Sequence, residues 1–294
     1  LGSDADIALV ETEPFALVEP RRELAGALAE VRRGGHKGIV ILTRGSRPGL
    51  FLLNAPSFRT PFGPPALQVS SAEAEWLMAQ AQRRAEVGLV VNVQKFAAQA
   101  FNVTTEVAGS DSALAPLVVT TPRSGWWQCA SERGGGLACW LETIRALAAA
   151  KPARNCLFAA FSGHEIGFLG IDAYLMPRSD LVKRARAWIH LGANIGAPRQ
   201  PNLVQVSDAF MERWIVAALE KNGLAVDHEA EAGLVPRGEA GTLHRGGARY
   251  AAVVCGTEVF HNPADRWPDA IDVASLARYA EAISEGACEL ALRD

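Results

Sequence analysis

The spacing of apolar and polar residues changes near residue 100. From Phe101 onwards, short apolar runs alternate with longer segments whose apolar residues recur at helical spacing. The short runs predict strands at 101–107, 117–121, 155–161, 187–191, 203–206 and 250–255, and the longer segments predict helices at 135–150, 167–175, 209–222 and 273–292. The run NCLFAAF is apolar throughout, which is typical of a strand covered on both faces. Residues 101–294 are therefore predicted to form an α/β domain, a mostly parallel sheet between two layers of helices.

Residues 1–100 follow a different pattern. Three short β-like runs, at 7–10, 38–42 and 50–53, are mixed with two segments of helical spacing at 21–33 and 71–86. The segment PSFRTPFGPP (56–65) contains four prolines and one glycine, so we expect a loop there. This part of the chain is predicted to be a smaller α+β domain.

Composition excludes some classes of partner. Among 294 residues, 29 are basic and 32 acidic, a net charge of -3, so we expect neither nucleic acid nor an anionic membrane as a partner. Apolar stretches such as 248–255, interrupted by Arg249, are shorter than the roughly 18 residues of a transmembrane helix. Five widely spaced cysteines, with no C-x-x-C pair, predict buried thiols and favour the reducing cytoplasm. If a signal peptide preceded Leu1, the protein would instead be periplasmic or secreted.

Three segments carry residues with catalytic or metal-binding chemistry. In SGHEIGFLG (162–170) a strand ends, the chain turns, and a helix is predicted to begin with His164 and Glu165. Phe168 stands four residues after His164, which excludes the zinc motif H-E-x-x-H. A purely structural alternative is that Glu165 stabilises the helix N-terminus electrostatically. In VFHNPADRWPDAID (259–272), His261 and Asp265 follow a predicted strand.

The third segment, ERGGGLACWLETIRALA (132–148), places Glu132 before a glycine-rich turn that opens a long apolar helix. The phosphate-binding patterns G-x-x-x-x-G-K and G-x-G-x-x-G do not occur in the sequence, and neither does the serine-hydrolase pattern G-x-S-x-G.

In this order and spacing, the three segments resemble the co-catalytic zinc aminopeptidase family. The family includes bacterial aminopeptidases, glutamate carboxypeptidase, glutaminyl cyclases and the catalytically dead ectodomain of the transferrin receptor. The resemblance covers about residues 101–294, with NVTTEVAG (102–109) similar to the family's opening strand and GEAGTLHRGGARY (238–250) a degraded form of a further motif. It implies a three-layer fold of the zinc-aminopeptidase type. Residues 1–100 are more weakly similar to the protease-associated domain that many members carry.

Position by position, the resemblance implies that half of the two-metal site is lost. The first zinc-binding His falls on Pro122 and its companion Asp on Ser124, and the third carboxylate ligand falls on Gly192. Proline and glycine offer no side-chain ligand, and Asn194, the nearest polar residue to the third position, carries a poor zinc ligand. The bridging Asp falls on Glu132, which is one methylene longer.

The other half of the site is retained in part. Glu165 matches a zinc-binding Glu and His261 the last zinc-binding His, so Glu132, Glu165 and His261 are predicted as ligands of a single zinc site. His164 takes the place of the general-base Glu, and its shorter ring would place a nitrogen away from the usual oxygen position. We therefore expect at most one zinc ion per chain, with none as the alternative.

These substitutions predict a metallopeptidase-like protein that is non-catalytic or repurposed to bind a peptide or small molecule. One alternative is a single-zinc hydrolase or cyclase acting on peptides or N-terminal amino acids. Another is a peptidase that recruits His190 or His244 as a ligand, although for His190 a histidine packed against a helix is the favoured interpretation. Trp126 and Trp127 lie near the lost first ligand and are predicted either to fill the vacated cleft or to line a ligand pocket.

Overall fold

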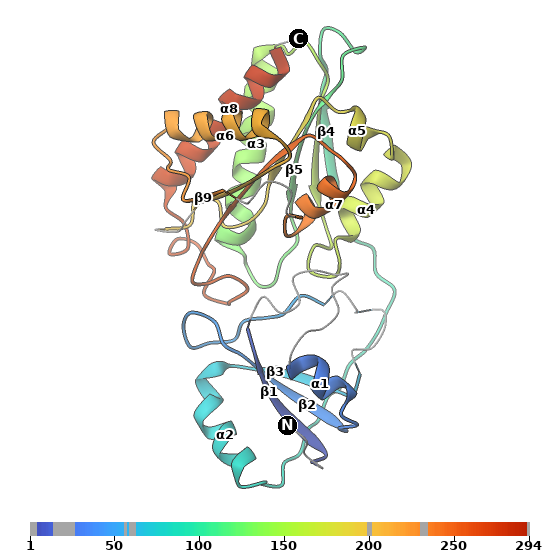
Figure 1. The fold of residues 1–294 in the computed structure, drawn as a ribbon, viewed down its shortest axis with the longest axis vertical. Helices are drawn as coiled ribbons and strands as arrows, with labels where there is room; N and C mark the ends of the chain where they lie inside the picture. Colours follow the sequence, from blue (N-terminus) through green and yellow to red (C-terminus); the bar gives the residue numbers. More distant parts are fainter. Residues whose placement is uncertain are drawn as a thin grey trace. The chain divides into compact units, whose positions relative to one another are not determined.

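The computed structural model describes residues 5–13, 27–55, 58, 63–198, 202–229 and 235–292. The chain divides into two compact units, which are coloured along the sequence in Figure 1. The larger unit comprises Ala100–His164, Phe168–Phe260 and Ala264–Asp294. The smaller unit comprises Leu1–Gln99 together with two short segments, Glu165–Gly167 and His261–Pro263.

A seven-stranded sheet forms the centre of the larger unit, with the strand order β4-β6-β5-β7-β10-β8-β9. Four of the six described strand pairs are parallel, and the pairs β4–β6 and β8–β10 are antiparallel. The strands are β4 (Val103–Val107), β5 (Leu117–Pro122), β6 (Cys156–Phe161), β7 (Ala187–Leu191), β8 (Asn202–Val206), β9 (His228–Glu229) and β10 (Tyr250–Cys255). The predicted three-layer α/β fold is confirmed.

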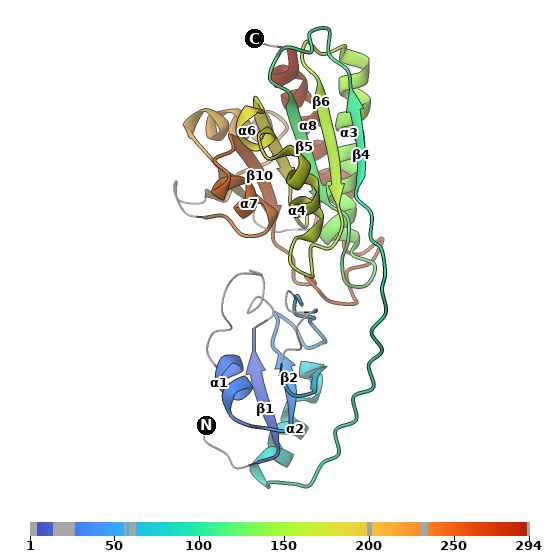
Figure 2. The ribbon, with the colours of Figure 1, turned by 90° about the vertical axis from the view of Figure 1, so that its right-hand side faces the viewer.

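Helices cover both faces of this sheet (Figures 1 and 2). The described helices of the larger unit are α3 (Gly135–Ala150), α4 (Leu169–Leu175), α5 (Leu181–Arg184), α6 (Ala209–Lys221), α7 (Glu239–Arg245) and α8 (Val273–Leu292). Helices α3, α6 and α8 share one apolar cluster with the sheet, and α4, α5 and α7 share the other. None of the helices in the described part of the chain is both long and apolar enough to cross a membrane.

Alternation along the strands decides which face each side chain occupies. In β7, Ile189 packs with the α3–α6–α8 layer and Trp188 with the α4–α5–α7 layer. Both faces are buried, which explains why the predicted strands are continuously apolar. The same alternation places His190 on the face of Trp188, under the layer that contains α7.

The smaller unit is built around a parallel sheet of β1 (Ile7–Thr12), β2 (Gly38–Thr43) and β3 (Ala66–Val69), in the order β1-β2-β3. Helix α1 (Ala27–Arg33) and helix α2 (Ala74–Gln82) accompany it. Residues 50–53 were predicted as a strand and are not one, although Phe51 and Leu53 are buried. Most of the predicted loop at 56–65, and residues 21–26 of a predicted helix, lie outside the described residues.

Other differences lie at the ends of elements. Helix α2 stops at Gln82 instead of Glu86 because Arg84 adopts a left-handed conformation with φ 51°. Helix α4 begins at Leu169, so His164 and Glu165 lie in the turn before it and do not open the helix as predicted. The predicted benefit of Glu165 to a helix N-terminus is therefore wrong.

Candidate functional site

The two positions predicted to lack a metal ligand are neighbours at the carboxyl ends of β5 and β7. Pro122 is the last residue of β5, and Gly192 directly follows β7. These strands are parallel and paired, with Thr120 opposite His190, so two residues later Pro122 and Gly192 come opposite each other. Ligands in open α/β sheets bind at this edge of the sheet. Neither residue has a side chain that can bind a metal.

Gly192 is also held too closely against β10 to be replaced by a carboxylate without rearrangement. A Cβ atom added there would lie 2.7 Å from Cγ2 of Val254 and 3.0 Å from the carbonyl oxygen of Val253. The backbone N–H of Gly192 donates a hydrogen bond of 2.9 Å to that same carbonyl. Nearby, the Nδ2 of Asn194 donates to the carbonyl oxygen of Cys255 at 2.8 Å, so this amide joins two strand ends.

A π-helical turn, Ala130–Gly134, presents Glu132 before α3 begins. Asp265 holds this turn, because its carboxylate accepts hydrogen bonds from the backbone N–H of Ser131 at 2.6 Å, the Ser131 hydroxyl at 2.8 Å and the N–H of Glu132 at 2.9 Å. Gly135 is required for the close approach that follows, since a Cβ atom there would lie 1.7 Å from the carbonyl oxygen of Ile195. Asp265 therefore fixes the backbone of the loop that carries Glu132.

The carboxylate of Glu132 is paired with the guanidinium of the next residue. Arg133 Nη2 lies 2.8 Å from Glu132 Oε1, and both side chains are almost fully buried. The Nε of Arg133 donates a hydrogen bond of 2.6 Å to the carbonyl oxygen of Ser124, and its Nη1 donates to the carbonyl oxygen of Glu132 at 3.2 Å. The resemblance places the companion Asp of the first zinc-binding His at Ser124 and the bridging Asp at Glu132. A fixed positive charge thus contacts the loops where that metal would be bound.

One group in the described part of the chain is compact enough for a metal ion: Cys129, Glu132 and Asp265, whose candidate ligand atoms lie within 4.8 Å of one another. The group fits zinc poorly. Burial, together with the Glu132 carboxylate, raises the pKa of the Cys129 thiol, so the thiol stays protonated and donates to the carbonyl oxygen of Trp126. Asp265 already holds the turn, and Glu132 faces Arg133. This group therefore does not fit the two-metal centre of the family that the sequence resembles.

A second polar cluster lies on the α7 side of the sheet. Glu239, the first residue of α7, is fully buried, and its Oε1 lies 3.4 Å from Nδ1 of His164. Its Oε2 lies 3.8 Å from Nε2 of His190. The other nitrogen of His190, Nδ1, is 3.0 Å from the hydroxyl of Thr120 on the neighbouring strand. Burial lowers the pKa of His190 to about 4, with a further contribution from Arg133, so this imidazole is neutral at pH 7.

Glu165 and His261 are buried in the two short segments that belong to the smaller unit. The N–H of Ala55 donates to the carbonyl oxygen of Glu165 at 2.6 Å. Nδ1 of His261 lies 2.7 Å from the carbonyl oxygen of Leu52. A carbonyl only accepts, so Nδ1 carries the proton, and this contact fixes the orientation of the His261 ring. The meeting of Glu165 and His261 with Glu132 in a single zinc site stays a prediction.

The paired tryptophans differ in their exposure. Trp126 is half-buried, whereas the Trp127 side chain is 48% exposed. Left-handed backbone conformations at non-glycine residues cost of order 1–3 kcal/mol and gather at functional sites. In the described larger unit they occur in the loops beyond the strand ends, at Trp127, Cys129, Phe168 and Asn194, and also at Lys151. The predicted role of the two tryptophans, to fill the vacated cleft or to line a ligand pocket, stays a prediction.

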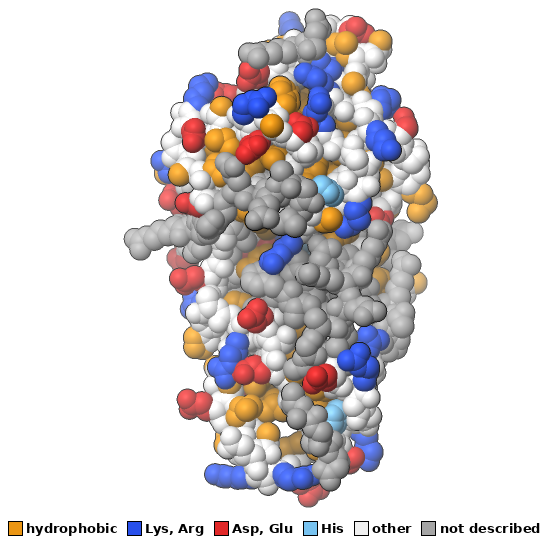
Figure 3. Space-filling model, viewed as in Figure 1, with side chains coloured by type: hydrophobic (Ala, Val, Ile, Leu, Met, Phe, Trp, Pro, Cys, Tyr) orange, Lys and Arg blue, Asp and Glu red, His pale blue; other side chains and the backbone are white. Residues whose placement is uncertain are grey.

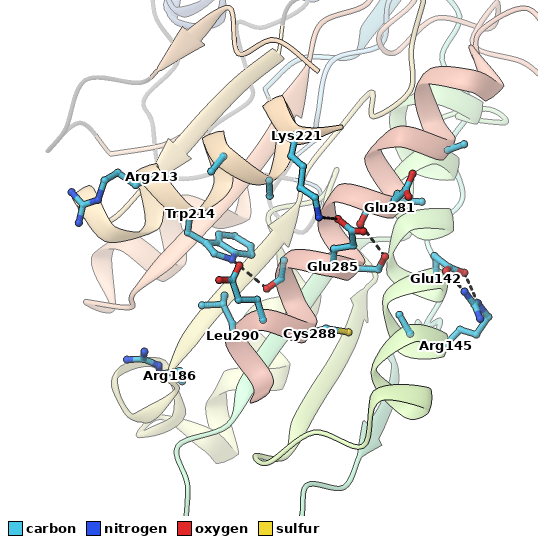
Figure 4. Close-up of a pocket in the computed structure, with 18 of the residues that line it drawn as sticks. Glu142, Arg145, Arg186, Arg213, Trp214, Lys221, Glu281, Glu285, Cys288 and Leu290 are labelled. Atoms are coloured by element: carbon cyan, nitrogen blue, oxygen red, sulfur yellow. Dashed lines mark hydrogen bonds and ion pairs between the residues drawn. The ribbon is translucent and has the colours of Figure 1, made fainter. Parts of the chain in front are cut away.

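A large hollow of about 1310 Å³ lies elsewhere, on the outer surface of α3, α6 and α8. Figure 4 shows the ion pairs Glu142–Arg145 and Lys221–Glu285 at this hollow, and Trp214, whose Nε1 donates to the carbonyl oxygen of Gly286 at 3.2 Å. All of its lining residues except Arg186 lie on α3, α6 and α8, so it is separate from the strand-end residues described above. Basic and acidic side chains are interspersed on the face seen in Figure 3, in agreement with the small net charge.

Sequence reasoning missed two charged residues of the site, Arg133 and Glu239. Arg133 follows Glu132 directly in the chain. An arginine beside a predicted metal ligand could have indicated that a guanidinium pairs with that carboxylate in place of a metal ion. Glu239 lies in the segment 238–250, where no helix was predicted and where α7 now begins. Its burial depends on how α7 packs against β7 and β10, which the local sequence does not reveal.

Comparison with known proteins agrees with this fold. Residues 107–287 match a protein-family model described as peptidase family M28. A peptidase M28 precursor from Shewanella amazonensis SB2B is similar in structure, with a TM-score of 0.72 and 20% sequence identity, covering 100% of this chain and 70% of that chain. The aminopeptidase from Aneurinibacillus sp. strain AM-1 has a TM-score of 0.68 and 16% identity, covering 98% of this chain and 70% of that chain.

BSAP, a zinc aminopeptidase from Bacillus subtilis, has a TM-score of 0.68 and 18% identity, covering 98% of this chain and 70% of its own. No protein of curated function matches the chain. At these identities the structural likeness establishes the fold, and the family match rests on the sequence of residues 107–287, more than half of the chain. The fold, the order of the strand-end loops and this match lead to one conclusion: the chain belongs to peptidase family M28.

Proposed function

We propose that this chain is a member of peptidase family M28 that binds a peptide or small-molecule ligand and does not hydrolyse peptides with two zinc ions. The observation that carries the proposal is the buried ion pair between Glu132 and Arg133, at 2.8 Å. A guanidinium at this distance occupies the carboxylate that would bridge two metals, and its charge repels a dication. The Arg133 guanidinium thus supplies to Glu132 the positive charge that a metal ion would otherwise supply.

The absence of ligands at the first-metal position supports the same proposal. Pro122 has no donor atom, and Gly192 packs against β10 with no room for a side chain. Zinc sites in proteins take N, S or O ligands in near-tetrahedral geometry, and catalytic sites keep three protein ligands. With two of three ligands absent, a second zinc ion has nothing to hold it.

Metal content tests the proposal directly. The protein should be purified without chelator and without a metal-affinity column, and its zinc measured by mass spectrometry before and after dialysis against zinc. We expect no zinc that survives gel filtration. Two zinc ions per chain would overturn the proposal.

Activity gives an independent readout. Hydrolysis of aminoacyl p-nitroanilides by the wild-type protein should equal that of a Glu165→Ala variant, because general-base transfer and metal assistance each account for large factors in such reactions. Turnover that requires zinc, and that is abolished by both Glu165→Ala and His261→Ala, would contradict a binding role.

A single-zinc hydrolase or cyclase is the second candidate. It is favoured by His261, whose Nδ1 lies 2.7 Å from the Leu52 carbonyl oxygen, so that a backbone acceptor orients the ring, as is usual for metal-binding histidines. One zinc ion per chain, together with turnover that depends on Glu165 and His261, would establish this candidate in place of the first.

A further inference from the structure

Four polar residues form a continuous series on the α7 side of the large sheet, and three of them, Thr120, His190 and Glu239, are buried. Thr120 lies on β5, His190 on β7, Glu239 at the start of α7, and His164 in the turn after β6. The contacts run from the Thr120 hydroxyl to His190 at 3.0 Å, from His190 to Glu239 at 3.8 Å, and from Glu239 to His164 at 3.4 Å. All four residues belong to the larger unit.

Glu239 is the unusual member of the series. Its side chain is 0% exposed, and within the described part of the chain neither carboxylate oxygen receives a hydrogen bond. Burying a carboxylate in this way is costly unless N–H groups are directed at it. The two nearest candidates are the imidazoles of His164 and His190, one facing each oxygen.

The His190 end fixes one tautomer. A neutral imidazole carries one N–H, and the carboxylate of Glu239 can accept a hydrogen bond but not donate one. If the proton were on Nδ1 of His190, the lone pair of Nε2 would face the carboxylate and be repelled. The Thr120 hydroxyl can donate to Nδ1 instead, which places the His190 proton on Nε2, directed at Glu239.

The same reasoning applies to His164, with a different result. Here Nδ1 is the buried nitrogen and faces Glu239, so the proton belongs on Nδ1 and the lone pair on Nε2. We propose that Glu239 is a positioning residue that holds His164 in this tautomer, so that Nε2 accepts a hydrogen bond from an N–H or O–H group of the bound ligand. His164 Nε2 would thus recognise the ligand of the proposed function, and this inference rests on the proposed function only in assuming that a ligand is bound.

The surroundings keep the His164 ring in place. Its ring packs against that of Phe168, with centroids 4.8 Å apart and planes tilted by 52°, and its backbone N–H donates to the Ser124 hydroxyl at 3.1 Å. Gly238, with φ +71°, passes close to the ring, and a Cβ atom there would lie 3.7 Å from Cε1 of His164. The His164 side chain keeps 11% of its surface exposed, whereas that of Glu239 keeps none. A ligand can therefore reach the imidazole but not the carboxylate.

Nitrogen NMR of the ligand-free protein tests the assignment. The whole protein is labelled with [¹⁵N]histidine, which gives signals from six residues, and His164 is identified by the signal lost in His164→Gln. At pH 8 a neutral imidazole with a bare Nε2 is distinguished from the opposite tautomer by the chemical shifts and proton couplings of its two nitrogens. We expect Nε2 of His164 and Nδ1 of His190 to be unprotonated, with the proton of each ring on its other nitrogen.

Substitution of Glu239 then tests the cause. Glu239→Met removes both acceptors and should convert His164 to the Nε2–H form that predominates in water, whereas Glu239→Gln retains a carbonyl acceptor and should preserve the bare Nε2. Glu281→Met, an exposed position of α8, is the matched control and should change neither histidine. If Glu239→Met does not fold, the wild-type tautomer and the Glu239→Gln spectrum still decide.

Two results would overturn the proposal. One is an Nε2–H form of His164 in the wild-type protein, or a tautomer that does not respond to Glu239→Met. The other is binding of zinc by His164 and His190 themselves, seen as loss of both signals on addition of zinc to the wild-type protein but not to Glu239→Met. The zinc content of the purified protein decides the proposed function separately, because the tautomer is measured without ligand or metal.

Discussion

Replacement of Arg133 tests whether a guanidinium has taken over the role of a cation in this site. Arg133→Met keeps much of the buried side-chain volume but removes the counter-charge of Glu132, 2.8 Å away. Removing one partner of a buried ion pair destabilises a protein by about 3–5 kcal/mol. Arg145→Met is the matched control, because the Arg145 side chain is 72% exposed beside Glu142 and such surface pairs contribute about 0–1 kcal/mol.

The effect is measured as the free energy of unfolding in urea at pH 7, with and without zinc. Glu132→Gln combined with Arg133→Met should recover about 2 kcal/mol relative to Arg133→Met alone, since no buried charge then lacks its counter-charge. At an effective dielectric constant near 20, unit charges 4 Å apart interact by about 4 kcal/mol, so a dication at that distance from the guanidinium is opposed by about 8 kcal/mol. Zinc should therefore stabilise Arg133→Met more than the wild-type protein.

Two outcomes would refute this reasoning. If Arg133→Met unfolds within about 1 kcal/mol of the wild-type protein, the ion pair contributes no more than an exposed one. If zinc at micromolar concentration stabilises the wild-type protein as much as the variant, the guanidinium does not exclude the metal.

Three further predictions follow from the packing and the pKa shifts. Gly192→Asp should destabilise the protein by about 1–3 kcal/mol in urea unfolding, because its Cβ would crowd Val254; Gly88→Ala, where nothing lies within 4 Å, should not. Asp265→Ala should lower stability by about 2–4 kcal/mol through loss of three hydrogen bonds at Ser131 and Glu132, against little change for the exposed Asp269→Ala. Stability should fall with pH below about 6.5 because of His190, and His190→Gln should flatten that part of the curve.

The sign of the pH effect follows from burial. Burial lowers the pKa of His190 to about 4 in the folded protein, from its ordinary value of 6.5. Between these values the unfolded chain binds more protons, so the contribution of His190 is complete above pH 6.5 and is lost as pH falls toward 4, by about 3 kcal/mol in total. His164, Glu239 and Arg133 face the same imidazole. An unchanged slope in His190→Gln would assign the acid sensitivity to other groups.

The Gly192 and Asp265 predictions have equally direct counter-results. A stable Gly192→Asp variant would mean that Val254 repacks readily, and Pro122→His with Gly192→Asp would then be expected to raise zinc content. If Asp265→Ala unfolds like the wild-type protein, the turn that carries Glu132 is held by its own backbone. Circular dichroism during urea titration suffices for both measurements.

The sequence by itself determined the larger fold. Continuous apolar runs such as 155–161 predict strands covered on both faces, and the helical spacing of 135–150 and 273–292 predicted α3 and α8 at their observed bounds. These signals are local, since the period of an element and its capping residues are written within one stretch of chain. Short elements such as α5, α7 and β9 carry too few residues for a period and were missed.

The order of the three segments also identified the family, and residue types alone predicted the loss of ligands at Pro122 and Gly192. What the tertiary structure decided is the electrostatic character of the site. Arg133 meets Glu132 through the π-helical turn, and Glu239 meets His164 and His190 only because α7 packs over β7. A charge acquires its role from burial and from the groups within about 4 Å of it, and contacts such as that between residues 164 and 239 join parts of the chain that no local pattern relates.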